Sequence, residues 1–252
     1  MIRKTIAIAL IGIFGVLKTP VEKSLDVRQE KAGLRNSPLD LGLRERVGQM
    51  GFLAALSGFR SPLAAYLWIE ANNAWERTEW GRMAGLFDTV TTLQPRSVLY
   101  WDMAAWHMAW NASNAALQDT SQHSEALRIR NQRQYFKLGR DYLERGIKNN
   151  PESSFLYRSL AILLRDKFED HCGAGKAFLT ASQLPDAAPY LTRFAGYELA
   201  KCPGQEKAAY DLLRKVYDAG PEGRKPTLKV TLQELEKKLD VPEAERINSG
   251  EH

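Results

Sequence analysis

The sequence lacks the short motifs that carry the chemistry of most enzymes. Its 252 residues contain no Gly-rich phosphate loop and no HExxH, CxxC or GxSxG motif. Those motifs set the spacing of phosphate-binding amides, zinc ligands, redox thiols and serine nucleophiles. We therefore predict a protein without enzymatic activity, with no catalytic residue, no metal site and no cofactor.

Long basic runs and strand-like alternation are also missing. Lys and Arg are interleaved with Asp and Glu, as in "RDYLERGIKNNPE", and the formal net charge is only +5. Nucleic-acid binding needs a basic patch or stripe, so we expect no nucleic-acid partner. From Leu63 onwards apolar residues recur at helical spacing, which predicts an all-α fold.

Cysteine and histidine are scarce. Cys172 and Cys202 are the only cysteines, and in an exported protein such a pair can form a disulfide. The alternative is two unpaired thiols near helix ends. Of the four histidines, His107 stands beside Trp106 and is the one candidate for a pocket residue.

The N-terminus resembles a targeting segment. Arg3 and Lys4 precede an apolar run from Thr5 to Leu17, and Lys18 follows it. The run is shorter than the roughly 20 residues of an ordinary membrane span, yet no small-x-small cleavage site comes after it. We predict an uncleaved signal anchor or transmembrane helix at residues 1–18, contacting the membrane through residues 2–18. A cleaved signal and a buried N-terminal helix are the alternatives.

The flanking charges predict the orientation of this anchor. Positive residues remain in the cytoplasm, so everything after Lys18 lies outside it. The expected location is the inner membrane of a bacterium, single-pass, with the folded domain on the periplasmic side. Cleavage would instead release the protein into the periplasm. Residues 19–61 read as a polar tether and an irregular N-terminal segment.

Prolines mark an internal period. A large residue follows two of them by six positions: Trp101 follows Pro95, and Tyr157 follows Pro151. Pro185 lies 34 residues beyond Pro151, and Pro221 closes a later unit. With the helix-like stretch "TEWGRMAGLFDTVTTLQP", this spacing resembles the tetratricopeptide repeat (TPR) family over residues 62–221.

The resemblance implies a TPR-like solenoid of helical hairpins. Residues 222–252 would hold a C-terminal capping helix, "KPTLKVTLQELEKKL", and a tail. Pro95 and Pro151 are 56 residues apart, 22 more than one repeat of 34. The extra residues, at about 112–133, are expected to lengthen both helices of one hairpin so that it projects from the solenoid. A disordered loop is the alternative.

The six tryptophans separate by helical geometry. Trp106 and Trp110 are four residues apart and share one face, whereas Trp101 points in another direction. The TPR resemblance implies that Trp101 packs in the core. It also implies that first-helix positions line a concave groove with an aromatic end and an arginine end: Trp68, Asn72, Trp75, Glu76, Asp102, Trp106, Trp110, Arg158 and Arg165.

The expected function follows from this groove. We predict a membrane-anchored scaffold or adaptor that binds a protein or peptide segment, with apolar side chains against the tryptophans and acidic groups against Arg158 and Arg165. The alternative to an open groove is that the chain's own N-terminal segment, "GQMGFLAALSGF", covers the inward-facing tryptophans. Two alternatives remain: a structural subunit of an envelope complex that binds through the projecting hairpin, and a small-molecule binder or enzyme using the Trp and His107 region.

Overall fold

The computed structural model describes residues 58–247, and all regular structure in this range is helical. No strand occurs among these residues, so the predicted all-α fold is confirmed for them. The helices are α3 (Arg60–Glu76), α4 (Trp80–Leu93), α5 (Val98–Trp106), η1 (His107–Ala112), α6 (Ser113–Gln118), α7 (Glu125–Asn149), α8 (Ser154–Phe168), α9 (His171–Ser182), α10 (Leu191–Ala200), α11 (Glu206–Asp218), η2 (Pro221–Gly223), α12 (Pro226–Lys238) and η3 (Glu243–Glu245).

The membrane prediction falls outside this range. The expected anchor at residues 1–18 and residues 19–57 of the tether are not among the described residues. Within the described residues, no helix combines the length and apolar character needed to cross a membrane. The last two residues of the predicted tether, 60–61, belong to α3.

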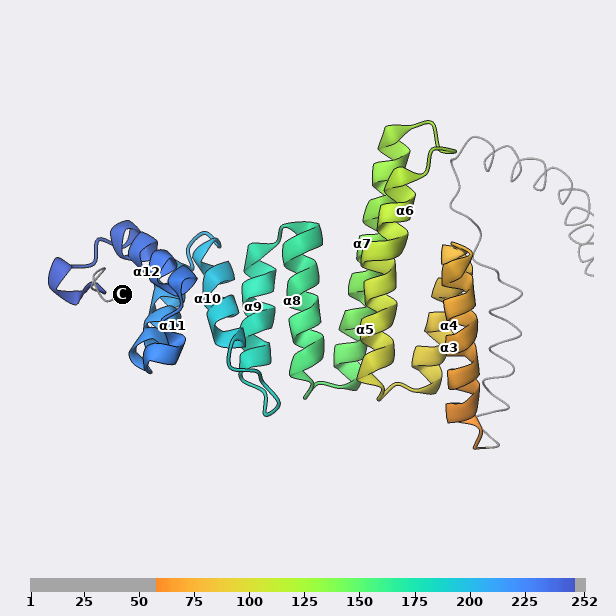
Figure 1. Ribbon diagram of the computed structural model, residues 1–252, viewed down its shortest axis with the longest axis horizontal. Coiled ribbons are helices and arrows are strands. Elements are labelled where there is room, and N and C mark those ends of the chain that lie inside the picture. Colours follow the sequence, from red (N-terminus) through yellow and green to blue (C-terminus); the bar gives the residue numbers. More distant parts are fainter. Residues whose placement is uncertain (1–57, 248–252) are drawn as a thin grey trace, which may run out of the picture.

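The helices pack in consecutive pairs that stand side by side in one row (Figure 1). The pairs are α3 with α4, α5 with α7, α8 with α9, and α10 with α11, and the row ends at α12. Helix α12 closes the last pair by burying Leu228, Leu232 and Leu235 in a core shared with α11. The described part of the chain is therefore repeat-like, with each helix contacting mainly its neighbours.

Prolines lie in the connections between pairs. Pro95 separates α4 from α5, Pro151 separates α7 from α8, and Pro185 separates α9 from α10. Proline donates no backbone hydrogen bond and disfavours the helical conformation of the residue before it. The chain must therefore leave its helix at these points, and each new pair begins a few residues later.

The second pair is longer than the others. Helices α5, η1 and α6 follow one another without a break from Val98 to Gln118, and α7 contains 25 residues. Residues 119–124 join the two arms, and the hairpin projects beyond the neighbouring pairs (Figure 1). Residues 112–133 are thus helical except for this connection.

The first arm of this hairpin contains a π-helical turn, η1. The hydroxyl of Ser113 donates hydrogen bonds to the carbonyls of Ala109 (2.7 Å) and Trp110 (3.2 Å), at the end of the wide turn. Such turns inside α-helices are rare and occur often at functional sites. Here the wide turn carries His107, Trp110 and Asn111.

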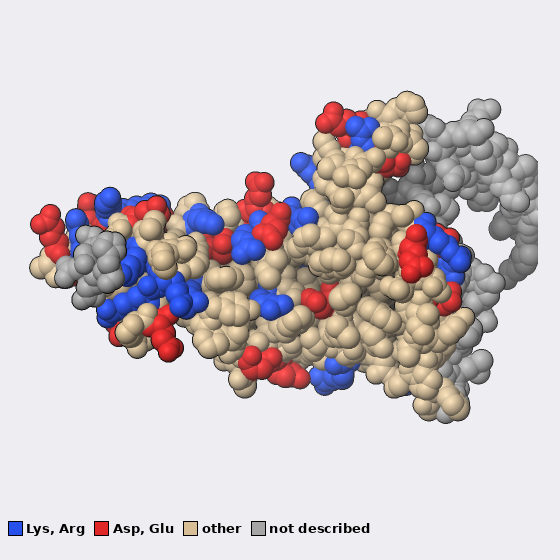
Figure 2. Space-filling view, in the orientation of Figure 1, with Lys and Arg blue, Asp and Glu red and all other residues tan. Residues whose placement is uncertain are grey.

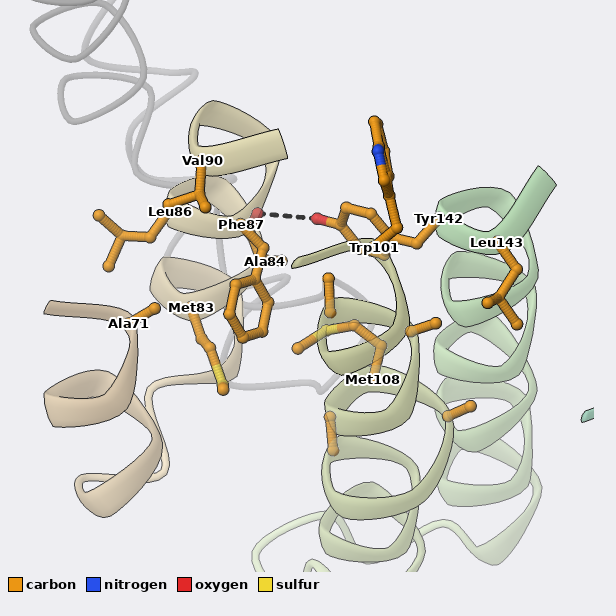
Figure 3. Close-up of a cluster of buried hydrophobic side chains, with 14 of the residues drawn as sticks. Ala71, Met83, Ala84, Leu86, Phe87, Val90, Trp101, Met108, Tyr142 and Leu143 are labelled. Atoms are coloured by element: carbon orange, nitrogen blue, oxygen red, sulfur yellow. Dashed lines mark hydrogen bonds between the residues drawn. The ribbon is translucent and has the colours of Figure 1, made fainter. Parts of the chain in front are cut away.

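One cluster of buried side chains joins the first two pairs (Figure 3). Trp101 is only 3% exposed, and its indole Nε1 donates to the carbonyl of Pro95 at 2.9 Å. The amide of Asn150 donates to the same carbonyl at 2.9 Å. Tyr142 is fully buried, and its hydroxyl donates to the carbonyl of Ala84 at 2.9 Å. These bonds hold the start of α5 and the last turns of α7 against the first pair and the connection that follows it.

Two glycines bring α7 into close contact with the first arm. A Cβ at Gly139 would lie 2.7 Å from the Cβ of Ala109 and 2.9 Å from the backbone oxygen of Ala105. A Cβ at Gly146 would lie 2.8 Å from the Trp101 side chain. Real Cβ atoms do not approach so closely, so both positions require glycine at this helix separation.

We predict that Gly139→Ala lowers the free energy of unfolding by about 1–3 kcal/mol, because the backbone of α5 must move to admit the methyl group. Gly85→Ala is the matched control, since a Cβ there meets nothing within 4 Å. That variant should stabilise helix α4 by about 0.5–1 kcal/mol. Urea unfolding followed by circular dichroism measures both, and equal effects of the two substitutions would contradict the packing described.

Candidate functional site

The nine predicted groove residues lie on the first helices of three successive pairs. Helix α3 carries four of them, the arm formed by α5 and η1 carries three, and α8 carries two. Because first helices of neighbouring pairs run side by side, residues one repeat apart come face to face. Asp102 is 56 residues before Arg158, and Trp110 is 56 before Asp166, the same interval as that between Pro95 and Pro151.

A cavity opens between α5, α7 and α8. It has a volume of about 260 Å³, and four predicted residues line it together with Asp166 and Ile162. Its full lining is Asp102, Ala105, Trp106, Trp110, Leu143, Arg158, Ser159, Ile162 and Asp166. The other five predicted residues, Trp68, Asn72, Trp75, Glu76 and Arg165, are not part of this lining.

Ser159 is the polar lining residue of α8 that sequence reasoning missed and that contacts Asp102. It stands next to Arg158 and three positions before Ile162, so helical spacing from Ile162 places it on the same face. The hydroxyl of Ser159 hydrogen-bonds the Asp102 carboxylate and lowers the pKa of Asp102. Serine is too common on helix surfaces for its identity alone to have signalled this contact.

Asp102 is one of two carboxylates that line the cavity, the other being Asp166. Burial raises the pKa of its carboxyl group above the ordinary value, and the hydrogen bond from Ser159 and the charge of Arg158 oppose this effect. Among the described residues no basic side chain forms an ion pair with it. A partly desolvated carboxylate without a paired cation is destabilising for the folded protein unless something compensates it.

The basic residues of α8 are each held by a partner. Arg158 donates from Nη1 to the hydroxyl of Tyr190 at 3.2 Å, and its guanidinium lies 4.4 Å from the centre of the Phe155 ring. Arg165 is bidentate to Asp166, with N···O distances of 2.6 and 3.3 Å. The predicted arginine end of the groove therefore has its charges already engaged.

The tryptophans of the first arm differ in exposure. Trp106 is 43% exposed, whereas Trp110 is half-buried and carries the Lys167 ammonium 5.0 Å from its ring centre. Burial also lowers the pKa of Lys167. A π-face on this side of the arm thus accepts a cation, and among the described residues no Lys or Arg lies over the partly exposed Trp106 ring.

Contacts between aromatic rings connect α3 to the arm formed by α5 and η1. His107 lies between Trp75 and Trp106, with ring centres 5.6 and 5.0 Å away, both in edge-to-face geometry. Trp75 is 39% exposed. The hydrogen bond between His107 Nδ1 and the Asn111 amide is 3.0 Å long; because the amide nitrogen donates, Nδ1 accepts it.

The other predicted residues of α3 are distributed differently. Trp68 is half-buried and packs against Phe87 and Tyr100 at 5.4 and 5.0 Å, on the border of the core. Asn72 and Glu76 are exposed. The structure therefore brings Asp102, Trp106, Trp110 and Arg158 together, places Trp75 beside them through His107, and sets Trp68 apart from the cavity.

Charge is distributed unevenly along the row. Figure 2 shows that uncharged residues cover most of the part formed by α3 to α7 on the side in view, while charged residues gather over α10 to α12. Exposed aromatic side chains and sparse charge are typical of surfaces that bind other proteins.

Cys172 and Cys202, which the sequence left as either a disulfide or two unpaired thiols, are joined by a disulfide. It links the start of α9 to the residue that follows α10 by two positions. His171 and Glu198 reinforce the same junction with an N···O distance of 2.7 Å. The third and fourth pairs are thereby covalently tied.

Comparison with known proteins identifies no relative. No protein-family model matches the chain, and no curated protein sequence matches it.

The geometry of His107 predicts a pH dependence. Burial lowers the pKa of His107 from 6.5 to about 4 in the folded protein. Between these values the unfolded chain binds a proton that the folded chain does not, so stability falls as the pH falls, on the order of 1 kcal/mol per pH unit. His107→Gln should remove this slope between pH 6.5 and pH 4.

Urea midpoints at several pH values measure the effect. His123→Gln, at an exposed histidine in the connection between α6 and α7, is the control and should keep the wild-type slope. Identical pH slopes in wild type and His107→Gln would show that His107 is protonated freely in the folded protein.

Proposed function

We propose that this protein is a membrane-anchored, TPR-like scaffold or adaptor of the bacterial cell envelope that binds a protein segment along the first helices of its repeats. The observation that carries the proposal is the cavity between α5 and α8, bordered by the open ring of Trp106. Trp, Tyr and Arg dominate binding energy at protein interfaces, and this site offers Trp and Arg together.

Several features support the TPR-like interpretation. Four helix pairs and a closing helix stand in a row, with prolines between pairs and a large residue six positions after Pro95 and after Pro151. Trp101 occupies the packing position that the resemblance assigns to it. The long second pair accounts for the 56-residue interval. A solenoid of this kind presents a continuous surface of first helices.

The size of the cavity favours a side chain over a small molecule. Small-molecule sites usually enclose roughly 300–1,000 Å³, and this cavity, at about 260 Å³, is smaller. His107 is buried, neutral at physiological pH and in contact with aromatic rings, which makes it a packing residue rather than a base. A segment of protein that inserts one or two anchors matches these dimensions better than a cofactor or substrate.

The projecting hairpin is the weaker candidate for the main contact. Its tip, residues 117–126, is mostly exposed and polar, with Leu117 as its one large apolar exposed side chain. Binding through polar, flexible side chains yields little net energy. We therefore keep the hairpin as a second surface, for a structural subunit of a larger envelope complex.

The disulfide favours a location of the helical domain in an oxidising compartment. Disulfides persist outside the cytoplasm and are rare within it. Together with the positively flanked apolar run at residues 2–18, the bond between Cys172 and Cys202 favours a periplasmic location for the helical domain, tethered to the inner membrane.

If the partner binds in the groove, the double variant Trp106→Ala plus Trp110→Ala should bind it with lower affinity. Each buried tryptophan anchor contributes about 2 kcal/mol or more to a typical interface, so affinity for the partner should fall by at least about 30-fold. Quantitative pull-down from solubilised membranes with the tagged full chain measures this, with circular dichroism to confirm folding.

Tyr66→Ala plus Val230→Ala is the matched control, because both side chains are exposed and lie away from the cavity and from the hairpin tip. Its partners should be unchanged. Deletion of residues 114–131 separates the two surfaces: loss of the partner on deletion, with full retention in the tryptophan variant, would transfer the function to the hairpin.

The proposed location predicts the redox state of the cysteines in cells. Expressed in a bacterial host, the full chain should fractionate with membranes and resist thiol alkylation until it is reduced. A variant lacking residues 2–18 should remain in the cytoplasm with both thiols free, because that compartment is reducing. Immediate alkylation of the full chain would contradict an exported domain.

A further inference from the structure

One carboxylate in the cavity forms no ion pair among the described residues. Asp102 lies on α5 against α8, where burial disfavours its ionised form, and the hydroxyl of Ser159 and the charge of Arg158 offset this only in part, so that its pKa stays raised. An apolar occupant would desolvate this carboxylate further without compensation, which is unfavourable. The occupant that compensates it most strongly carries a positive charge.

Trp106 provides the second half of such a site. Asp102 and Trp106 are four residues apart on one helix face, a spacing that places their side chains next to each other. A cation is attracted to the face of an indole within about 6 Å of the ring centre. Four residues later on the same arm, the Trp110 ring already contacts the Lys167 ammonium in this way, at 5.0 Å. Among the described residues no Lys or Arg lies over Trp106.

The neighbouring arginines do not lie over the Trp106 ring. They also do not form a binding site for an anion. Arg158 is fixed by Tyr190 and by the Phe155 ring, and its Nε is buried without a hydrogen-bond partner and out of reach of a ligand. Arg165 is committed to Asp166. An anion in the cavity would lie near two carboxylates, those of Asp102 and Asp166.

We propose that the cavity takes a lysine or arginine side chain of the bound protein segment, with its charged end on Asp102 and its stem between Trp106 and Ile162. This inference rests on the proposed function. It differs from the chemistry expected from the sequence, in which acidic groups of the partner meet Arg158 and Arg165, because it places a basic anchor at the aromatic end. The apolar wall of Ala105, Leu143 and Ile162 accommodates the methylene stem, as long basic side chains require.

The test uses three fluorescein-labelled nonapeptides of Gly, Ser and Ala with a central Arg-Leu, citrulline-Leu or Glu-Leu pair. Citrulline has nearly the shape of arginine but no charge. Fluorescence anisotropy with the full chain in mild detergent should show the arginine peptide binding about tenfold more tightly than the citrulline peptide, the scale of one charge-assisted hydrogen bond. The glutamate peptide should bind least.

Substitutions test whether Asp102 is responsible for the preference for arginine over citrulline. Asp102→Asn should abolish the difference between arginine and citrulline, and Asp102→Lys should reverse the preference towards the glutamate peptide. Asp211→Asn, at a carboxylate of α11 that is paired with Lys207 and is not part of the cavity lining, should leave the arginine preference intact. Circular dichroism of each variant confirms that it is folded.

The outcomes separate this inference from the proposed function. Equal binding of arginine and citrulline peptides, or no binding of the arginine peptide at about 1 mM, overturns the basic anchor. If the double tryptophan variant still loses its membrane partner in that case, the groove function stands with different chemistry. If neither the tryptophan variant nor Asp102→Asn has any effect, both proposals are wrong.

Discussion

The contact of α7 with the arm formed by α5 and η1 determines how the tryptophans are presented. Gly139 and Gly146, seven residues apart, let α7 approach until it touches Ala109 and Trp101. Because Trp101 is held under Gly146 and bonded to the Pro95 carbonyl, the arm cannot rotate about its axis. Trp106 and Trp110 must then face α8, across the cavity, and cannot turn into the core.

The same contact connects the core to the groove. Between the two glycines, Tyr142 reaches α4 through the Ala84 carbonyl, and Arg145 pairs with Asp88 of α4 at 2.9 Å. The long pair is therefore anchored to the pair before it. On its other side it meets α8 through Asp102, Ser159 and Trp110, where polar and aromatic groups replace the close apolar packing. The cavity arises at this change from tight to loose packing.

Much of this arrangement could be predicted from the sequence, because the signals were local. Proline positions gave the boundaries of helix pairs, helical spacing separated Trp101 from Trp106 and Trp110, and the interval of 56 residues pointed to one long pair. Four of the nine predicted groove residues line the cavity. These features depend on backbone chemistry and on periodicity, which a single sequence records directly.

The features that could not be predicted depend on contacts between distant residues. The π-turn at His107–Ala112 has no sequence signal beyond ordinary helix formers. Trp68 packs against Phe87 and Tyr100, and the arginines are held by Tyr190 and Asp166, because of neighbours that spacing alone does not reveal. Cys172 and Cys202 had two readings until their positions at one junction were known. The segment predicted to cover the tryptophans, residues 48–59, lies outside the described residues except for Gly58 and Phe59, and Phe59 is 64% exposed.

The most direct test of the groove places a photo-crosslinker at the open ring. The full chain carries p-benzoylphenylalanine at position 106 in one sample and at position 230 of α12, which is also exposed, in the other. Irradiation in intact cells is followed by mass spectrometry of the adducts. A binding groove predicts an adduct of position 106 with a second protein, through a segment that contains a basic residue, and none from position 230. An adduct of position 106 with residues 48–59 of its own chain would instead show that the groove is covered from within, which contradicts a binding function at this site.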